Sequence, residues 1–400
     1  MSQDTLTLLT SGADTPPSGD LAVQVDRLEG LAYADLQRFA EAEQRLKEAE
    51  GLCPSPNNSV SCTDVIAARG TVEMSRGHLD RAQLFFERVL SLDRGLADPF
   101  REANAMLSLS NCALQQEHFD EAVDWADSSY RLSSTLGFED VAQNALGNLG
   151  WAYYRLGESE KAEGLFVEAE KRAIQLGDVT DQVKWLTTGG YIYLDARRYS
   201  DAERSYHQAL NLAQNTSKQD TLDALMSLAL VSERTGNLNQ ARDYADQTIA
   251  LTPADGDRLD VLYPMLVKGR VAARMHDTAQ AEKTFREIEQ DPKSHVFLRW
   301  EAEHSLAQLY EDENKPDFSD REYRAALSTF ETARSSLKRE ESELPFPANA
   351  AKIYDDYIHF LVSQGKVPEA LQVAEYSRGR TLAEGLGLLQ KGTSFKPDPL

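Results

Sequence analysis

The side chains of this sequence that could do chemistry are amides and cations, with a few aromatic rings beside them. Because an asparagine amide both donates and accepts hydrogen bonds, a row of asparagines suits the backbone of an extended peptide. Arginine and lysine side chains suit acidic side chains or a carboxylate. The candidate contact residues are Asn104, Asn111, Asn144, Asn148, Trp151, Tyr154, Arg155, Lys184, Tyr191, Arg234, Arg270 and Arg274.

Residues for catalysis or metal binding do not gather in any familiar motif. The sequence contains neither a GxxxxGK[ST] phosphate loop nor an HExxH zinc motif, and its seven histidines are scattered. Gly385-Leu386-Gly387 is a fragment of a glycine loop that lacks a third glycine. We therefore expect no catalytic, cofactor-binding or metal site, and no enzymatic activity in this chain.

The cysteine content indicates a reducing compartment. Three cysteines are few for 400 residues. Cys53 and Cys62 nevertheless flank a short loop that contains two prolines, so that a disulfide between them stays open as an alternative. The N-terminal segment has no basic region followed by a long apolar run, and it is not a convincing signal peptide. Cytoplasm is the expected location.

The charge balance disfavours two classes of partner. With 65 acidic and 42 basic residues, the formal net charge is −23. Such a surface repels phosphate backbones and anionic lipids, so we expect no nucleic-acid and no membrane binding. No apolar run approaches the roughly 18 residues that a membrane span requires.

A period of about 40 residues organises the chain. Alanines that follow a polar break and precede a large side chain recur along the sequence, and a spacing this regular predicts an array of repeats. These anchor alanines are Ala42, Ala82, Ala122, Ala162, Ala202, Ala241, Ala281, Ala326 and Ala370.

Each repeat reads as two helices joined by a short turn. A small residue such as Gly150 precedes the anchor Ala162, and a large one such as Phe166 follows it on the same helical face. We expect Gly150 to face Ala162 and to set the helix crossing. Two irregularities interrupt the period: residues 312–320 are expected to lengthen the eighth hairpin, and residues 338–349, with two prolines, to loosen the connection to the ninth.

The segment from Leu146 to Phe166 resembles the tetratricopeptide repeat (TPR). It follows the family pattern of Leu146, Leu149-Gly150, Tyr153, Ala162 and Phe166, although the period exceeds the usual 34 residues. The resemblance implies an all-α, right-handed solenoid of about nine hairpins. The expected organisation is a flexible leader (1–20), eight repeats (21–337), a linker (338–350), a ninth hairpin with an extended terminal helix (351–390) and a tail (391–400).

In such a solenoid the first helices line a concave groove, and the candidate contact residues occupy its expected positions. For Trp151 and Tyr154, packing against the neighbouring hairpin is the alternative. The basic residues have two alternative interpretations. They could attract an acidic partner electrostatically, or they could form ordinary ion pairs with nearby acidic residues, as Arg234 could with Glu233. The expected function is recognition of a protein or peptide partner.

The segment Ala374–Glu384 resembles the end of the TPR array in bacterial TPR–CHAT proteins, in which a caspase-like peptidase domain follows. The resemblance implies a scaffold or sensor that regulates an adjoining CHAT domain, which would pack on residues 377–390. Leu382, Leu386, Leu388 and Leu389 would be exposed for that contact, or would fold back on the ninth hairpin. The alternative function is a free-standing TPR adaptor or signalling regulator without an enzyme.

Overall fold

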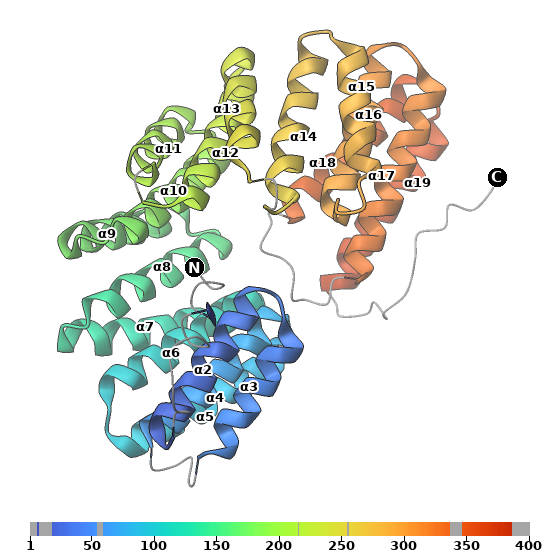
Figure 1. The fold of residues 1–400 in the computed structure, drawn as a ribbon. Helices are drawn as coiled ribbons and strands as arrows, with labels where there is room; N and C mark the ends of the chain where they lie inside the picture. The colour runs from blue at the N-terminus through green and yellow to red at the C-terminus, as the bar shows by residue number, and fades with distance from the viewer. Residues whose placement is uncertain are drawn as a thin grey trace. The chain divides into compact units, whose positions relative to one another are not determined.

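The computed structural model describes residues 6–7, 18–53, 59–214, 216–253, 256–336 and 346–385. The described residues form helices joined by short turns, which follow one another in antiparallel pairs (Figure 1). This confirms the expected all-α solenoid. The helices are α2 (Asp20–Asp35), α3 (Phe39–Gly51), α4 (Val60–Ser75), α5 (Leu79–Leu96), α6 (Pro99–Gln115), α7 (Phe119–Leu136), α8 (Glu139–Arg155), α9 (Ser159–Leu176), α10 (Val179–Asp195), α11 (Tyr199–Ala213), α12 (Lys218–Thr235), α13 (Leu238–Leu251), α14 (Leu259–Arg274), α15 (Thr278–Gln290), α16 (Val296–Asp312), α17 (Pro316–Ser336), α18 (Phe346–Ser363) and α19 (Val367–Gly385).

The chain divides into two compact units, Met1–Trp185 and Leu186–Lys338 with Ser342–Leu400. In the first unit, Cys53 and Cys62 form a disulfide that ties the end of α3 to the first turn of α4. Cys112 is buried, and burial raises the pKa of its thiol to about 12. No helix in the described part of the chain is long and apolar enough to cross a membrane.

The turn inside each hairpin has the same backbone conformation. Its central residue lies in the left-handed region, and the following N–H bonds to a carbonyl five residues earlier, as from Glu158 to Tyr153 at 2.8 Å. This is the Schellman motif, which satisfies the last carbonyls of the first helix. The central residues of these turns, within the described segments, are Gln37, Gly77, Glu117, Gly157, Arg197, Gly236, His276, Asn314 and Gly365.

The anchor position is the fourth residue of each second helix, and it is buried in every described hairpin. In the eighth hairpin the predicted anchor is wrong, because Ser319 and not Ala326 occupies this position in α17. Its hydroxyl donates to the Ala307 carbonyl at 2.9 Å, as Ser110 does to the Ala122 carbonyl at 3.1 Å. The turn between α16 and α17 therefore has ordinary length, and residues 312–320 do not lengthen this hairpin.

The helix crossing depends on a small residue of the first helix and the residue sixteen positions later. The nearest neighbour of Gly150 is the Phe166 ring, since a Cβ added at Gly150 would lie 2.9 Å from it. That Gly150 also faces Ala162 stays a prediction, and the equivalent Ser110 bonds to the Ala122 carbonyl. Where the first residue is Ser110 or Ala229 instead of glycine, the later residue is a fully buried alanine. A large side chain at the later position thus goes with glycine at the first, and alanine at the later position goes with serine or alanine at the first, with Ala307 and Tyr323 as an exception. The glycine pairs are Gly30–Leu46, Gly70–Phe86, Gly150–Phe166, Gly190–Tyr206 and Gly269–Phe285.

This size complementarity predicts coupling between the two positions. We expect Gly150→Ser to destabilise the wild-type protein, because the added atoms meet the Phe166 ring. Phe166→Ala together with Gly150→Ser recreates the pairing of Ser110 with Ala126. In the Phe166→Ala background, Gly150→Ser should therefore lower the free energy of unfolding by about 1–2 kcal/mol less than it does in the wild-type protein. A double-mutant cycle of urea unfolding measures this coupling. Strictly additive costs would contradict the proposed packing.

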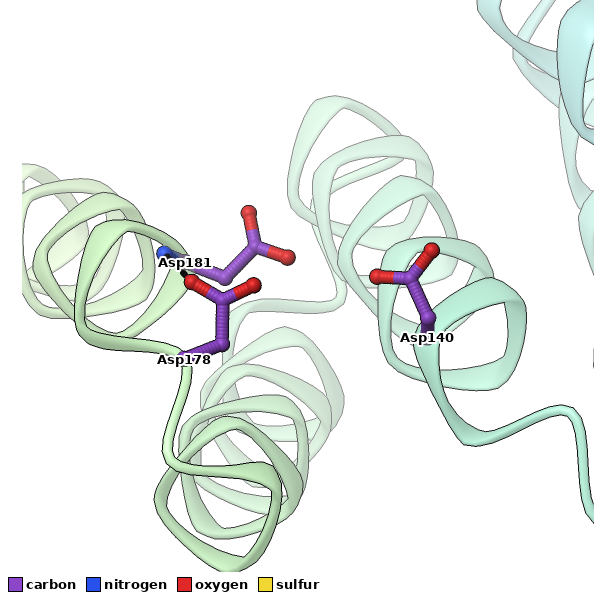
Figure 2. A group of neighbouring side chains, drawn as sticks. All are labelled: Asp140, Asp178 and Asp181. Atoms are coloured by element: carbon purple, nitrogen blue, oxygen red, sulfur yellow. Dashed lines mark hydrogen bonds between the residues drawn. The ribbon is translucent and has the colours of Figure 1, made fainter.

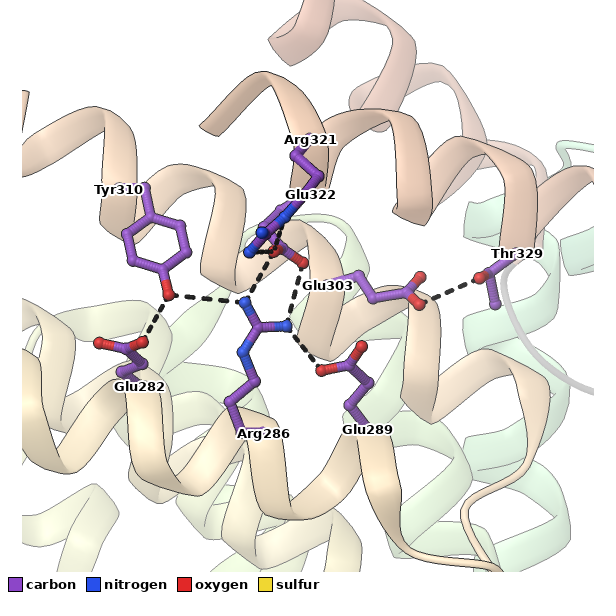
Figure 3. A network of polar contacts seen from close by, with 8 residues as sticks. All are labelled: Glu282, Arg286, Glu289, Glu303, Tyr310, Arg321, Glu322 and Thr329. Atoms are coloured by element: carbon purple, nitrogen blue, oxygen red, sulfur yellow. Dashed lines mark hydrogen bonds and ion pairs between the residues drawn. The ribbon is translucent and has the colours of Figure 1, made fainter. Parts of the chain in front are cut away.

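In the second unit a polar network connects three consecutive helices (Figure 3). Arg286 of α15 donates to both carboxylate oxygens of Glu322 in α17, at 2.7 and 3.2 Å, and to Glu289 at 2.7 Å. Burial opposes ionisation of Glu322, but its bonds with Arg286 and Arg321 lower its pKa. Glu303 of α16 lies beside this network, and one of its oxygens accepts from Thr329 at 3.1 Å.

Candidate functional site

The twelve candidate contact residues all lie on first helices of hairpins. They occupy α6, α8 and α10 up to Lys184 in the first unit, and α10 from Tyr191, α12 and α14 in the second. Every one of them is half-buried or exposed. The sequence therefore predicted correctly that these residues are accessible. The structure also shows hydrogen-bond and ion-pair partners that the sequence did not reveal.

Two of the asparagines pair with each other across neighbouring repeats. The Asn148 amide in α8 donates to Asn111 Oδ1 in α6 at 2.8 Å and lies 3.3 Å from the Ser110 hydroxyl. This bond orients both amides before any ligand arrives. Pre-ordered polar groups lose less side-chain entropy on binding, so the pair is a suitable anchor for a peptide backbone.

The other two asparagines are held by their own helices. The Asn104 amide donates to the Phe100 carbonyl at 2.9 Å, and the Asn144 amide donates to the Asp140 carbonyl at 3.1 Å. Asn144 Oδ1 also accepts from Lys184 Nζ at 2.9 Å, which links α8 to α10. Asn144 and Lys184 therefore act together as one polar link between repeats.

The aromatic residues of α8 pack on each other. The rings of Trp151 and Tyr154 have centroids 5.5 Å apart, with planes inclined at 40°. Arg155 pairs with Glu117 at 2.9 Å and stacks over the Phe119 ring at 4.6 Å. Arg155 thus joins two hairpins, while Trp151 and Tyr154 keep part of their surface accessible.

Two of the three candidate arginines of the second unit are held by neighbouring acidic and carbonyl groups. Arg270 pairs with Glu301 and lies 4.0 Å from Glu233, while Arg274 donates to the Glu233 carbonyl. Burial alone would lower the pKa of Arg270, but the charges of Glu301 and Glu233 raise it. Glu233 therefore interacts with Arg270 through its carboxylate and with Arg274 through its backbone carbonyl. The pairing of Glu233 with Arg234 that the sequence suggested as an alternative is not among these contacts. Arg234 is exposed.

The partners of these residues were not identified from the sequence, although a signal exists. The bonds Asn148–Asn111, Arg155–Glu117 and Lys184–Asn144 join positions 37, 38 and 40 residues apart, which is one repeat period. A search for complementary polar residues one period apart would have found them. Their common function is to connect successive hairpins along the accessible face.

Comparison with protein-family models decides what the repeats are. The model of the tetratricopeptide repeat matches residues 67–136 and 187–256, and a second model of this repeat matches residues 145–175. These segments are tetratricopeptide repeats. The second match covers the whole of the TPR-like pattern from Leu146 to Phe166. No curated protein sequence matches the chain.

Solved TPR-type structures share the fold. The Rap protein complexed with Competence and Sporulation Factor is 12% identical, with 84% of this chain and 98% of that chain covered and a TM-score of 0.58. The apo quorum sensor NprR from B. thuringiensis is 13% identical, with 82% and 97% covered and a TM-score of 0.58. The STAND protein with a tetratricopeptide repeat sensor from Pyrococcus horikoshii is 15% identical, with 84% and 54% covered and a TM-score of 0.59. At these identities the likeness concerns the fold alone.

Proposed function

We propose that the chain is a non-catalytic sensor or scaffold whose first helices hold an extended segment of a protein partner. The pre-oriented pair of Asn111 and Asn148, beside the accessible rings of Trp151 and Tyr154, carries this proposal. Amides that are fixed in position can bond to a peptide backbone of any sequence, whereas aromatic surface supplies apolar contact. The complex of Rap with a factor and the description of NprR as a quorum sensor support a sensor function.

For the second unit, taken by itself, we propose that it attracts acidic side chains of a partner. Arg234 and Arg274 are exposed there, within a chain whose net charge is −23. Local positive charge accelerates the association of an acidic ligand, mainly at low ionic strength. Arg270 is excluded from this function, because Glu301 and Glu233 already compensate its charge.

The test uses a partner identified by pull-down with mass spectrometry. We expect Asn111→Ala/Asn148→Ala to weaken binding of its segment at least about thirtyfold, because each of the two hydrogen bonds left unmade costs about 1–2 kcal/mol. Arg234→Glu/Arg274→Glu should slow association at low salt, and the effect should fade as salt screens the charges. Calorimetry and surface plasmon resonance measure these quantities.

Matched charge reversals on second helices provide the control. Arg131 of α7 and Arg204 of α11 are exposed, and Arg131→Glu/Arg204→Glu should leave both affinity and association rate unchanged. If this control variant weakens binding while the first-helix variants do not, the second helices are the binding surface and the proposal is wrong.

A finer proposal is that the chain regulates an adjoining CHAT peptidase domain. It rests on the resemblance of Ala374–Glu384, which lies in α19, to the end of TPR–CHAT arrays. Leu386, Leu388 and Leu389, which were expected to be exposed for this contact, lie outside the described residues, and so does the side chain of Leu382. A coding sequence beyond Leu400 with a caspase-like pattern and a His–Cys pair would support this proposal. Its absence would favour the free-standing adaptor.

The location is a separate proposal. The low cysteine content favours the cytoplasm, but the bond between Cys53 and Cys62 is more typical of oxidising compartments. Fractionation of cells that produce the protein, with thiol labelling of these cysteines, tests the cytoplasmic location.

A further inference from the structure

The Cys53–Cys62 disulfide lies at a junction between hairpins that differs from the junctions after it. Cys53 follows α3, the second helix of the first hairpin, and Cys62 lies in the first turn of α4, which begins the second hairpin. Helix α3 has 13 residues, whereas the second helices α5, α7 and α9 of the next three hairpins have 18 each. The chain therefore leaves α3 more than one helical turn early.

A hydrogen-bonded turn closes each of the next three junctions in the first unit. The residue in the left-handed region is followed by an N–H that donates to the carbonyl five residues earlier, as from Asp178 to Ala173 at 2.9 Å. Figure 2 shows this last junction, where Asp178 Oδ1 also accepts the backbone N–H of Asp181 at 2.9 Å. After α3, in contrast, Leu52 is right-handed with φ −83°. The disulfide closes this junction in place of such a turn. The left-handed residues of the three later junctions are Ala97, Gly137 and Gly177.

The two sulfur atoms of the disulfide differ in exposure and in electrostatic surroundings. Cys53 is half-buried, whereas Cys62 is only 3% exposed. Cys62 is the third residue of α4, where the positive end of the helix dipole stabilises a thiolate. Cys53 follows the C-terminal end of α3, where the dipole disfavours a thiolate. An attacking thiolate therefore reaches the sulfur of Cys53 more easily, and Cys62 is the better leaving group.

We propose that the Cys53–Cys62 bond is a site of thiol–disulfide exchange with a dithiol reductant. One thiolate of the reductant attacks Sγ of Cys53, which forms a mixed disulfide and expels Cys62 as a thiolate that takes up a proton from water. The second thiol of the reductant loses its proton and attacks the reductant's own sulfur in the mixed disulfide. Cys53 then leaves as a thiolate and is protonated in turn. The protein disulfide has gained two electrons, and the dithiol has become a disulfide.

The third cysteine takes no part in this exchange. Cys112 is buried, and its Sγ donates to the Leu79 carbonyl at 3.3 Å. Burial raises the pKa of its thiol to about 12, so that it forms little of the nucleophilic thiolate. Because the sequence contains only three cysteines, Cys53 and Cys62 are the pair whose oxidation state can change.

Reduction of the disulfide would loosen the first hairpin from the second. Cys53 packs against the buried side chains of Val23 in α2, Ala49 in α3 and Val65 in α4, so the disulfide fastens the core that these three helices share. Opening a covalent loop of about ten residues should raise the population of the detached hairpin about a hundredfold, by the loop-entropy relation. This effect goes beyond the proposed peptide binding and does not depend on it.

The test is reduction of the full chain with dithiothreitol, followed by thiol counting with a maleimide and by hydrogen exchange with mass spectrometry. We expect two thiols per chain to become reactive together, while Cys112 stays protected. Amides of α2 and α3 should exchange about a hundredfold faster after reduction, and those of α8 and α9 should keep their rates. The proposal is overturned if the thiols appear only in denaturant, or if exchange accelerates equally in all four helices.

Glutathione, which is a monothiol, tests the order of attack. Its adduct with the protein is the product of the first step, and peptide mass spectrometry after an early acid quench locates it. We expect the adduct on Cys53 to exceed that on Cys62 at least about tenfold. Equal adducts, or an excess on Cys62, would refute the assignment of Cys53 as the attacked residue.

Cys53→Ser/Cys62→Ser is the matched control. Serine is close in size to cysteine but cannot form the bond, so this variant should exchange hydrogen like the reduced wild-type protein and show no response to dithiothreitol. Circular dichroism verifies that the variant is helical. A response of this variant to dithiothreitol would place the effect of the reductant elsewhere and overturn the proposal.

Discussion

Replacing Gly147 with alanine is expected to destabilise the first unit by about 3 kcal/mol, although alanine favours helices. A Cβ at this position of α8 would lie 2.1 Å from Cη2 and 2.2 Å from Cζ3 of Trp185 in α10. Trp185 is only 4% exposed, so its rigid ring has little room to move. Either the two first helices separate or the indole leaves its site, and both lose buried contacts.

Gly164 provides the control for this substitution. It lies inside α9, where a new Cβ would meet nothing within 4 Å. Gly164→Ala should therefore stabilise the protein by about 0.5–1 kcal/mol through helix propensity alone. Urea unfolding followed by tryptophan fluorescence and circular dichroism compares the two variants. Equal stabilisation by both would show that Gly147 does not pack against Trp185.

Replacing Glu303 with glutamine is expected to stabilise the second unit strongly at pH 8 and weakly at pH 5. Glu303 is 7% exposed, and its Oε2 is buried without a hydrogen-bond partner. Burial raises its pKa to about 7, while the bond from Thr329 and the charge of Arg299 oppose the shift and the charges of Glu289 and Glu322 add to it. The carboxyl group is therefore protonated in the folded protein at a pH where the unfolded chain is already ionised.

The sign of the pH dependence follows from proton linkage. Between the unfolded pKa of 4.5 and the folded value of about 7, the folded state binds more protons, so wild-type stability falls as the pH rises through this window. Glutamine removes this loss. The gain from Glu303→Gln at pH 8 should exceed the gain at pH 5 by about 2–3 kcal/mol.

Unfolding titrations at the two pH values measure this difference. Comparing each variant with wild type at the same pH cancels the titration of the many other acidic groups. Glu287, an exposed glutamate of α15, supplies the control, and Glu287→Gln should show no comparable dependence. A pH-independent effect of Glu303→Gln would mean that Glu303 is ionised throughout.

The hairpins could be predicted from the sequence because their signal is periodic. Small anchors and large partners recur every 40 residues or so, and most second helices begin where this pattern places them. The eighth anchor was missed because the pattern required alanine. The position requires only a small side chain, and the hydroxyl of Ser319 finds a carbonyl across the hairpin.

The candidate surface could be predicted only as far as helical periodicity reaches. Helical periodicity predicts which face of α6 carries Asn111 and which face of α8 carries Asn148. The hydrogen bond between them depends on how α6 and α8 are shifted and rotated against each other, and the sequence of one helix does not determine this. The same limit applies to Gln143 and Glu303. Their buried amide and carboxyl groups occupy helix positions that a sequence pattern treats as ordinary polar residues.

The left-handed turn at the centre of each hairpin has a consequence for how the sequence can drift over evolutionary time. At Gly77, Gly157, Gly236 and Gly365, almost any mutation adds backbone strain, so purifying selection should act strongly there. At Gln37, Glu117, Arg197 and His276, side chains already tolerate this conformation. Exchanges among such residues are close to neutral, and substitution rates should differ between turns of identical shape.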